Sequence, residues 1–262
     1  MVQGRAGTPT LIERTLRADR THTLVLLFVL PALCWAWIVV MARDMYGPMT
    51  GASRWMMTMR WDAAHLFLLW AMWADMMTGM MLPSAAPVIL LYAATVRRRE
   101  QGDAALGIYA LAGGYLFVWA SFSVLATALQ RVLAGLLVLT PMMEVASPRA
   151  AALLLGAAGG YQLMPFKRAC LTACQSPLGV LLRHWREGRA GAFRIGLWHG
   201  LYCVGCCWAL MLLLFAGGVM NLTVIGGLTV FVLSEKFGLL GRQGGRVSGA
   251  LLIALAVWML AS

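Results

Sequence analysis

Residues 65–96 read HLFLLWAMWADMMTGMMLPSAAPVILLYAATV, an apolar run whose single charged residue is Asp75. A helix needs about 20 mostly apolar residues to cross the hydrocarbon of a bilayer, because no water is present there to satisfy the backbone. This run exceeds that length. Pro83 lies inside it and removes one backbone donor. The run therefore predicts a membrane-spanning helix that bends near Pro83.

The composition of the whole chain agrees with a membrane protein. The 262 residues are 61% hydrophobic and 12% charged, which excludes an ordinary soluble protein. The formal net charge is +11, but the basic residues cluster between apolar runs and do not cover one continuous face, which argues against nucleic-acid binding. Six cysteines spread over this length exclude a small domain built on disulfides.

Apolar stretches along the chain predict an all-α, polytopic transmembrane bundle with about seven spans. The stretches cover residues 23–41, 65–96, 104–128, 150–164, 195–216, 221–233 and 248–261. The fourth, sixth and seventh are short, and the apolar segment 132–143 is a candidate re-entrant or interfacial piece. Residues 1–22 form a basic tail, so we expect one transmembrane helical domain over residues 23–262.

The positive charges orient this bundle. Of the 21 Lys and Arg residues, sixteen lie in the N-terminal tail and in the second, fourth and sixth connections between spans. The remaining five lie in the first and third connections. Because cytoplasmic loops carry an excess of Lys and Arg, this distribution predicts a cytoplasmic N-terminus.

The second span combines an acid with thioethers. A carboxylate inside a membrane costs on the order of 3 kcal/mol on insertion scales, so Asp75 should face a partner, a cation or a water cavity. Helical spacing places Met72, Met76 and Met80 on the same side of the helix as Asp75. Pro83 also frees the carbonyl of Gly79 as a further oxygen ligand. The alternative is that the methionines are apolar packing and Asp75 is a hydrogen-bond acceptor.

The fifth span predicts a second group of ligands. It contains His199, Cys203, Cys206 and Cys207, and the first three share a narrow stripe at helical spacing. Imidazole and thiolate ligands suit Cu(I), and zinc is a second choice. The alternative is that these cysteines are small buried hydrophobes without a metal role.

Two further segments near the cytoplasmic side add candidate ligands. Cys170 and Cys174 lie four residues apart, so on a short amphipathic helix after the fourth span they form one dithiol face. The alternative is that Cys170 and Cys174 are half-buried thiols with a structural role only. Glu235 and Lys236 close the sixth span. We expect them to form an interfacial ion pair or a snorkelling anchor, with Glu235 as a candidate metal ligand.

The pattern CVGCCW at residues 203–208 is the most specific motif in the chain. With the second span, the run YQLMPFKRAC at 161–170, GVMN at 218–221 and the Glu235–Lys236 pair, it resembles the bacterial family of predicted metal-binding integral membrane proteins. The resemblance covers most of the chain from the second span to Lys236. It implies a multi-pass fold in the bacterial inner membrane and a metal, often discussed as copper.

These features favour a membrane protein that binds Cu(I) and takes it up, relays it or inserts it. Methionines are dense in the expected outer segments (Met45, Met49, Met56, Met57, Met59, Met142 and Met143), whereas most cysteines lie toward the cytoplasmic half. Thioethers need no deprotonation and bind Cu(I) weakly, so this gradient favours inward passage toward thiolates. The expected partners are the bilayer, the metal ion and a copper chaperone or membrane metalloenzyme complex.

We do not expect an enzyme. The chain has no nucleotide-binding loop, so it is not itself an ATP-driven pump. One alternative is a structural or assembly subunit of a membrane metalloenzyme complex. A less favoured one is a metal- or haem-dependent membrane oxidoreductase, which would need axial ligands from the four histidines.

Overall fold

The computed structural model describes residues 21–47, 54, 61–98, 104–136, 139–140, 143–240 and 243–261, so most of the predicted tail 1–22 lies outside the described residues. Across this part of the chain every regular element is a helix, and one isolated antiparallel pairing joins Leu139 to Val145. The elements are a π-helical turn at Val25–Val29, then α2 (Leu30–Met45), α4 (Ala63–Met81), a 3-10 turn (Leu82–Ala85), α5 (Ala86–Arg98), α6 (Ala104–Gly135), α7 (Pro148–Leu163), α8 (Pro165–Cys174), α9 (Pro177–His184), α10 (Gly188–Met211), α11 (Leu213–Gly217), α12 (Leu222–Lys236) and α13 (Gly244–Ala261). The predicted all-α class is confirmed.

Within the described residues, five helical stretches are long and apolar enough to cross a membrane. They are Thr21–Met45, Ala63–Val96, Ala104–Gly135, Gly188–Gly217 and Gly244–Ala261. The predicted fourth and sixth spans correspond to α7 and α12, which have 16 and 15 residues. Both are shorter than the roughly 20 residues that a span needs. Seven spans and the orientation of the N-terminus therefore stay predictions.

The segment 132–143 does not form a separate helix in its described part. Its first residues continue α6 to Gly135. Beyond them, Leu139 pairs with Val145, and the Val145 N–H donates to the Phe215 carbonyl at 2.9 Å. The hydrogen bond from Val145 to Phe215 holds the chain between α6 and α7 against α11.

The predicted break at Pro83 is present. α4 ends at Met81, a 3-10 turn follows over Leu82–Ala85, and α5 resumes at Ala86. The missing N–H of Pro83 leaves the carbonyl of Gly79 without its helical partner. That carbonyl accepts a hydrogen bond from Trp35 Nε1 at 3.2 Å. The freed carbonyl thus has the α2 indole as a partner, and its expected role as a metal ligand stays a prediction.

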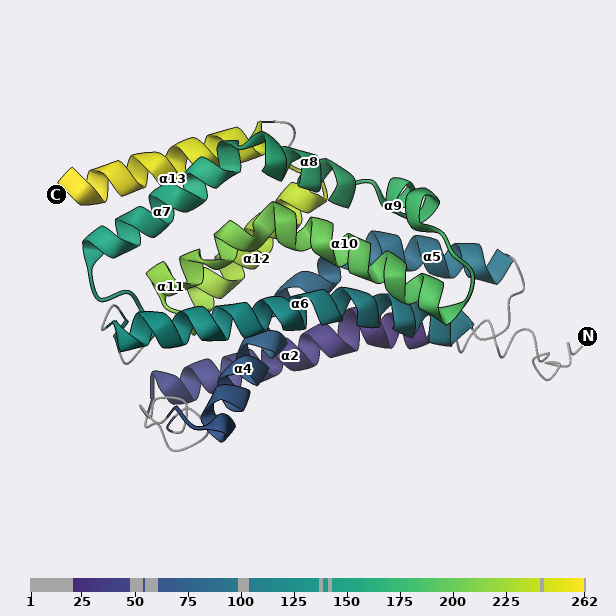
Figure 1. Cartoon of the computed structure of the whole chain (residues 1–262), viewed down its shortest axis with the longest axis horizontal. Coiled ribbons are helices and arrows are strands. Elements are labelled where there is room, and N and C mark those ends of the chain that lie inside the picture. Colours follow the sequence, from purple (N-terminus) through teal and green to yellow (C-terminus); the bar gives the residue numbers. More distant parts are fainter. Residues whose placement is uncertain are drawn as a thin grey trace, which may run out of the picture.

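The most extensive contact between helices joins α6 to α10, which run side by side through the centre of the molecule (Figure 1). Glycines allow this approach. A Cβ on Gly114 would press on the Phe193 carbonyl oxygen, and a Cβ on Gly196 would press on the Leu111 carbonyl oxygen. Small residues permit close backbone packing of this kind between membrane helices.

A second close pair is formed by α7 and α13, which lie beside each other at one edge of the molecule (Figure 1). A Cβ on Gly159 would lie 2.8 Å from the Gly249 carbonyl oxygen. Leu251, Leu255 and Trp258 on α13 are exposed. α13 is therefore attached through one glycine-lined face and leaves an apolar face outward.

Gly114→Ala should separate α6 from α10. The added methyl group has no room against the Phe193 carbonyl, and overpacking of this kind costs about 1–3 kcal/mol. Gly113→Ala is the matched control, because a Cβ there meets nothing within 4 Å and Ala favours a helix over Gly by about 1 kcal/mol. Thermal unfolding of the detergent-solubilised protein measures both variants. Equal unfolding temperatures would contradict this packing.

Candidate metal centre

The sulfur-rich face of α10 lies inside the bundle. His199, Cys203, Cys206 and Cys207 are all at most 1% exposed. The stripe predicted from helical spacing therefore faces other helices. Gly200 helps to place it there, because a Cβ at that position would lie 2.9 Å from Val118 Cβ on α6.

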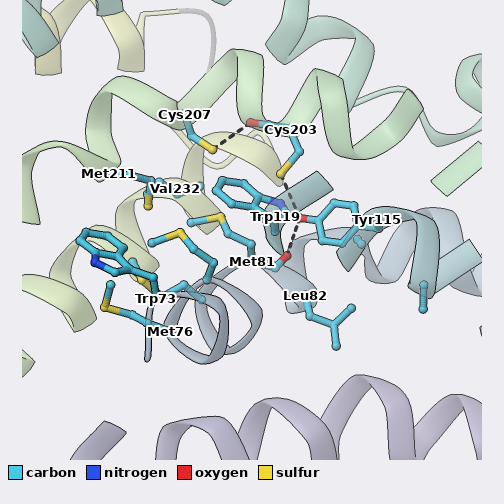
Figure 2. Packing of buried hydrophobic residues seen from close by; sticks show 14 of the residues in the cluster. Trp73, Met76, Met81, Leu82, Tyr115, Trp119, Cys203, Cys207, Met211 and Val232 are labelled. Atoms are coloured by element: carbon cyan, nitrogen blue, oxygen red, sulfur yellow. Dashed lines mark hydrogen bonds between the residues drawn. The ribbon is translucent and has the colours of Figure 1, made fainter. Parts of the chain in front are cut away.

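Cys203 is the residue at which these helices meet. Its Sγ lies 2.5 Å from Lys236 Nζ, 2.9 Å from Tyr115 OH and 4.0 Å from Ser84 Oγ. Figure 2 shows the Tyr115 contact beside the methionines of α4. The three partners come from α12, α6 and the turn after α4. Four elements distant in sequence thus converge on one sulfur atom.

The break at Pro83 supplies the opposite side of the centre. The Met81 carbonyl accepts hydrogen bonds from Tyr115 OH at 2.8 Å (Figure 2) and from Ser84 Oγ at 2.7 Å. The thioether of Met81 lies 4.0 Å from Lys236 Nζ. Met81 therefore brings a hydrogen-bonded oxygen atom and a soft sulfur atom to the same interior region.

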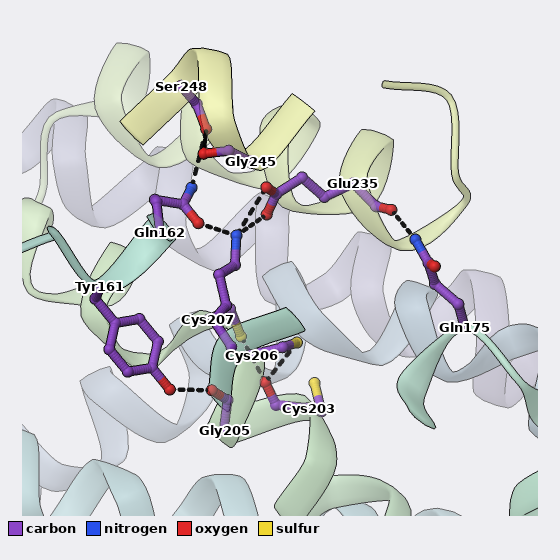
Figure 3. Close-up of polar contacts among 11 residues, drawn as sticks. Tyr161, Gln162, Gln175, Cys203, Gly205, Cys206, Cys207, Glu235, Gly245 and Ser248 are labelled. Atoms are coloured by element: carbon purple, nitrogen blue, oxygen red, sulfur yellow. Dashed lines mark hydrogen bonds and ion pairs between the residues drawn. The ribbon is translucent and has the colours of Figure 1, made fainter. Parts of the chain in front are cut away.

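The remaining thiols surround Cys203. Cys206 and Cys207 donate to the Cys203 carbonyl at 3.1 and 2.8 Å (Figure 3). Cys174, at the end of α8, is buried and lies beside the Cys203 and Cys206 thiols. Sulfur atoms from α4, α8 and α10 are therefore neighbours in the interior, and donors of this type favour Cu(I).

His199 is a buried imidazole with unused nitrogens. It is fully buried and stacks on Tyr115, with ring centroids 5.6 Å apart. Neither ring nitrogen has a hydrogen-bond partner among the described residues. Buried polar atoms are nearly always paired, so an orphaned imidazole next to thiols points to an absent ligand.

These residues fit Cu(I) better than zinc. Within the described residues, no group of three or more His, Cys, Asp or Glu side chains is arranged to hold a metal ion. Structural zinc sites use four such ligands in a tetrahedron, so nothing in this arrangement supports zinc. Cu(I) also accepts thioethers, so the Cys203 and Met81 sulfur atoms, which both lie near Lys236 Nζ, are the donors of this region that suit it.

The two cysteines of α8 both face α10. A Cβ on Gly205 would lie 2.8 Å from Cys170 Sγ, and the hydroxyl of Tyr161 donates to the Gly205 carbonyl (Figure 3). Cys170 is half-buried, whereas Cys174 is buried. Burial, followed by the nearby Cys206, raises the pKa of the Cys170 thiol. A metal arriving at Cys170 must therefore displace a proton.

The predicted face of Asp75 and methionines has mixed surroundings. Met72, Met76 and Met80 belong to the buried hydrophobic core, and Figure 2 shows Met76 beside Trp73. Asp75 is partly exposed and lies beside the Cys34 thiol of α2, while its Oδ2 atom has no hydrogen-bond partner. The Asp75 side chain therefore faces α2. Its neighbour Cys34 was not predicted from the sequence.

Glu235 does not pair with Lys236. Both of its carboxylate oxygens accept hydrogen bonds from Lys167 Nζ, at 2.7 and 2.6 Å, and Lys167 also donates to Gln162 (Figure 3). The Glu235 carbonyl accepts from Gln175 Nε2 at 2.6 Å. The expected interfacial pair with Lys236 is wrong, because successive helical residues point about 100° apart. Because both carboxylate oxygens of Glu235 already accept hydrogen bonds from Lys167, Glu235 is a poor candidate for a metal ligand.

Sequence reasoning missed three residues of the centre. Tyr115 and Ser84 looked like ordinary residues within spans, and Lys236 was placed at the membrane interface. One signal was present for Lys236. Charged residues at the end of an apolar span usually face the interior of the bundle, and Glu235 and Lys236 are both buried here, at 4% and 6% exposed.

The dense outer methionines are only partly described. Met45 and Met143 are buried, and Met143 adopts a positive φ of 58°. Met49, Met56, Met57, Met59 and Met142 lie outside the described residues. The expected gradient from thioethers to thiols therefore stays a prediction.

No curated protein and no solved structure matches the chain. A family model described as PpoB2, copper chaperone, matches residues 70–259. This region holds every predicted ligand as well as Lys236, Tyr115 and Ser84, and it spans more than half of the sequence. The chain therefore belongs to the PpoB2 copper chaperone family.

Proposed function

We propose that this protein is a multi-pass protein of the bacterial inner membrane that binds Cu(I) as cargo at Cys203 and passes it on by ligand exchange. The observation that carries the proposal is the convergence of buried sulfur donors from three helices beside an imidazole with unused nitrogens. The copper chaperone family and the five membrane-length apolar helices found within the described residues support it.

The position of the thiols favours a stepwise path. Cys170 is the more accessible thiol of α8, Cys174 is buried beside Cys203 and Cys206, and Cys203 is fully buried. A cation moving between adjacent sulfur atoms exchanges one ligand at a time and is never left without ligands in the low-dielectric interior. We infer that α8 connects the centre to the cytoplasmic side, where a copper-binding partner or a metalloenzyme complex gives or takes the ion.

Movement of copper through this centre needs no catalytic step. Ligand exchange and the membrane potential, worth about 2.3 kcal/mol per charge per 100 mV, are sufficient driving forces. Asp75 is suited to the outer part of the route, because the residue is partly exposed while its buried Oδ2 atom has no hydrogen-bond partner, so the carboxylate can neutralise a cation inside the bundle. The proposed protein is thus a carrier and not an enzyme.

Replacing Cys203 and Cys206 together by Ser should remove most bound copper. Loss of protein ligands lowers metal affinity by at least about 100-fold, judged from the effect of outer-shell changes alone. Elemental analysis of detergent-purified protein gives the copper content per chain. Cys34→Ser is the control for copper content, because Cys34 is on α2 and its neighbour Asp75 is expected to affect the rate of copper movement more than the amount bound. Wild-type protein without copper, or equal losses in both variants, would favour a purely structural subunit.

Asp75→Asn should slow copper movement more than it lowers copper binding. The amide keeps the size of the side chain but cannot neutralise a cation, so we expect the initial rate of Cu(I) uptake into proteoliposomes to fall about tenfold, the equivalent of about 1.4 kcal/mol. A chelator trapped inside reports the rate. Glu187→Gln is the matched control, since it removes an equal charge from an exposed position at the start of α10. Equal rates in the two variants would exclude this role.

A further inference from the structure

Lys236 carries a buried positive charge inside the candidate centre. It is 6% exposed, and its Nζ contacts Cys203 Sγ at 2.5 Å and Ser84 Oγ at 3.0 Å. Its sequence neighbour Glu235 is paired with Lys167. Among the described residues, no carboxylate lies within ion-pair distance of Lys236.

A buried ammonium needs compensation. Taking an unpaired charge out of water costs several kcal/mol, so buried lysines are paired with groups that can be negative. The group available here is the sulfur of Cys203, which is negative as a thiolate, and an adjacent cation stabilises that form. The contact of 2.5 Å therefore places the buried ammonium directly beside a sulfur atom that can carry a negative charge.

The ammonium lies among the donors that suit copper. Nζ has the Cys203 sulfur on one side and the Met81 thioether 4.0 Å away. A thioether gains little from an ammonium but is a good ligand for Cu(I). A cation near the Nζ position would therefore have the Cys203 sulfur beside it, and a shift of the Met81 side chain would bring in a second soft donor.

We propose that Lys236 is an internal counter-cation that occupies the copper position in the metal-free protein and withdraws when Cu(I) binds. The proposal rests on the function proposed above. In the exchange, the contact between Nζ and the Cys203 sulfur breaks and a copper–sulfur bond forms. One unit of positive charge replaces another, so the net buried charge is unchanged and no electron is transferred.

The position of Lys236 at the end of its helix determines how far its ammonium can move. Lys236 is the last residue of α12, and Gly238 follows with a positive φ of 73°. A cavity of about 730 Å³ lies beside this end of α12. Its lining includes Glu235 and Gln175 together with the basic Lys167, Arg168 and Arg246, and Lys236 itself does not line it. The flexible four-carbon stem of lysine allows its ammonium to move by several ångströms without movement of the helix.

Such a competitor makes the site reversible. Copper binding must displace an ammonium, and copper release lets the ammonium return, so the Cys203 sulfur never stays uncompensated. Lys236 would lower the affinity for Cu(I) and speed its transfer to an acceptor. This property suits a protein that must give up its cargo.

The first test compares Lys236→Leu with Lys236→Arg and wild type. Leu removes the charge without adding a donor atom, whereas Arg retains a cation. Competition with the Cu(I) chelator bicinchoninate in detergent should show Cu(I) binding about tenfold tighter in Lys236→Leu, the equivalent of about 1.4 kcal/mol, with unchanged stoichiometry and slower release. Lys236→Arg should stay near wild type. Equal or weaker binding by a folded Lys236→Leu variant would overturn the proposal.

The second test uses wild-type protein and so does not depend on the folding of a variant. The sequence contains two lysines, Lys167 and Lys236, which makes labelling of amines simple to assign by mass spectrometry. Cu(I) should expose Lys236 to an amine-reactive reagent, while Lys167, paired with Glu235, should stay protected as the internal control. Unchanged labelling of Lys236 in copper-saturated protein would overturn the counter-cation role and leave the copper function intact. Wild-type protein that binds no Cu(I) would overturn both.

Discussion

The glycine contact between α6 and α10 is the constraint on which the centre depends. Gly114 and Gly196 remove side chains where the two backbones meet, and Tyr115 follows Gly114 directly. Its hydroxyl can therefore reach both the Cys203 sulfur and the Met81 carbonyl. A larger separation between these helices would take the Tyr115 hydroxyl away from both groups and leave it unsatisfied in an interior without water. The close packing of α6 and α10 thus allows the Tyr115 hydroxyl to connect α10 with the end of α4.

Features that depend on local sequence could be predicted. Long apolar runs predicted the helices, Pro83 predicted the break after α4, and the spacing of His199, Cys203 and Cys206 predicted that they share one face. The copper-related family was also anticipated from the CVGCCW motif and its companions, and the family match supports that relation to copper. Each of these properties is encoded within one segment, because helix formation and helical spacing are local.

Features that depend on pairing between segments could not be predicted. Trp35 donates a hydrogen bond to the Gly79 carbonyl, and Cys34 lies beside Asp75. Lys167 forms an ion pair with the Glu235 carboxylate. Each partner lies at least 40 residues away in sequence, as shown by the 44-residue separation of Trp35 from Gly79 and the 68-residue separation of Lys167 from Glu235. With a single sequence, nothing indicates which of several acids a buried lysine meets. Lys167 forms the ion pair with Glu235, and Lys236 lies at the Cys203 sulfur instead.

The short α7 and α12 helices have a consequence for the surrounding lipid. At 1.5 Å per residue, helices of 16 and 15 residues extend over roughly 22–24 Å, which is less than the roughly 30 Å of hydrocarbon in a typical bilayer. If these two helices span the membrane, as the sequence predicts, the bilayer around them has to thin locally, and that mismatch costs a fraction of a kcal/mol per ångström. Acyl-chain length would then set how far the Lys236 end of α12 lies from water. The thickness of the host membrane would thereby influence how easily an ion reaches the thiols.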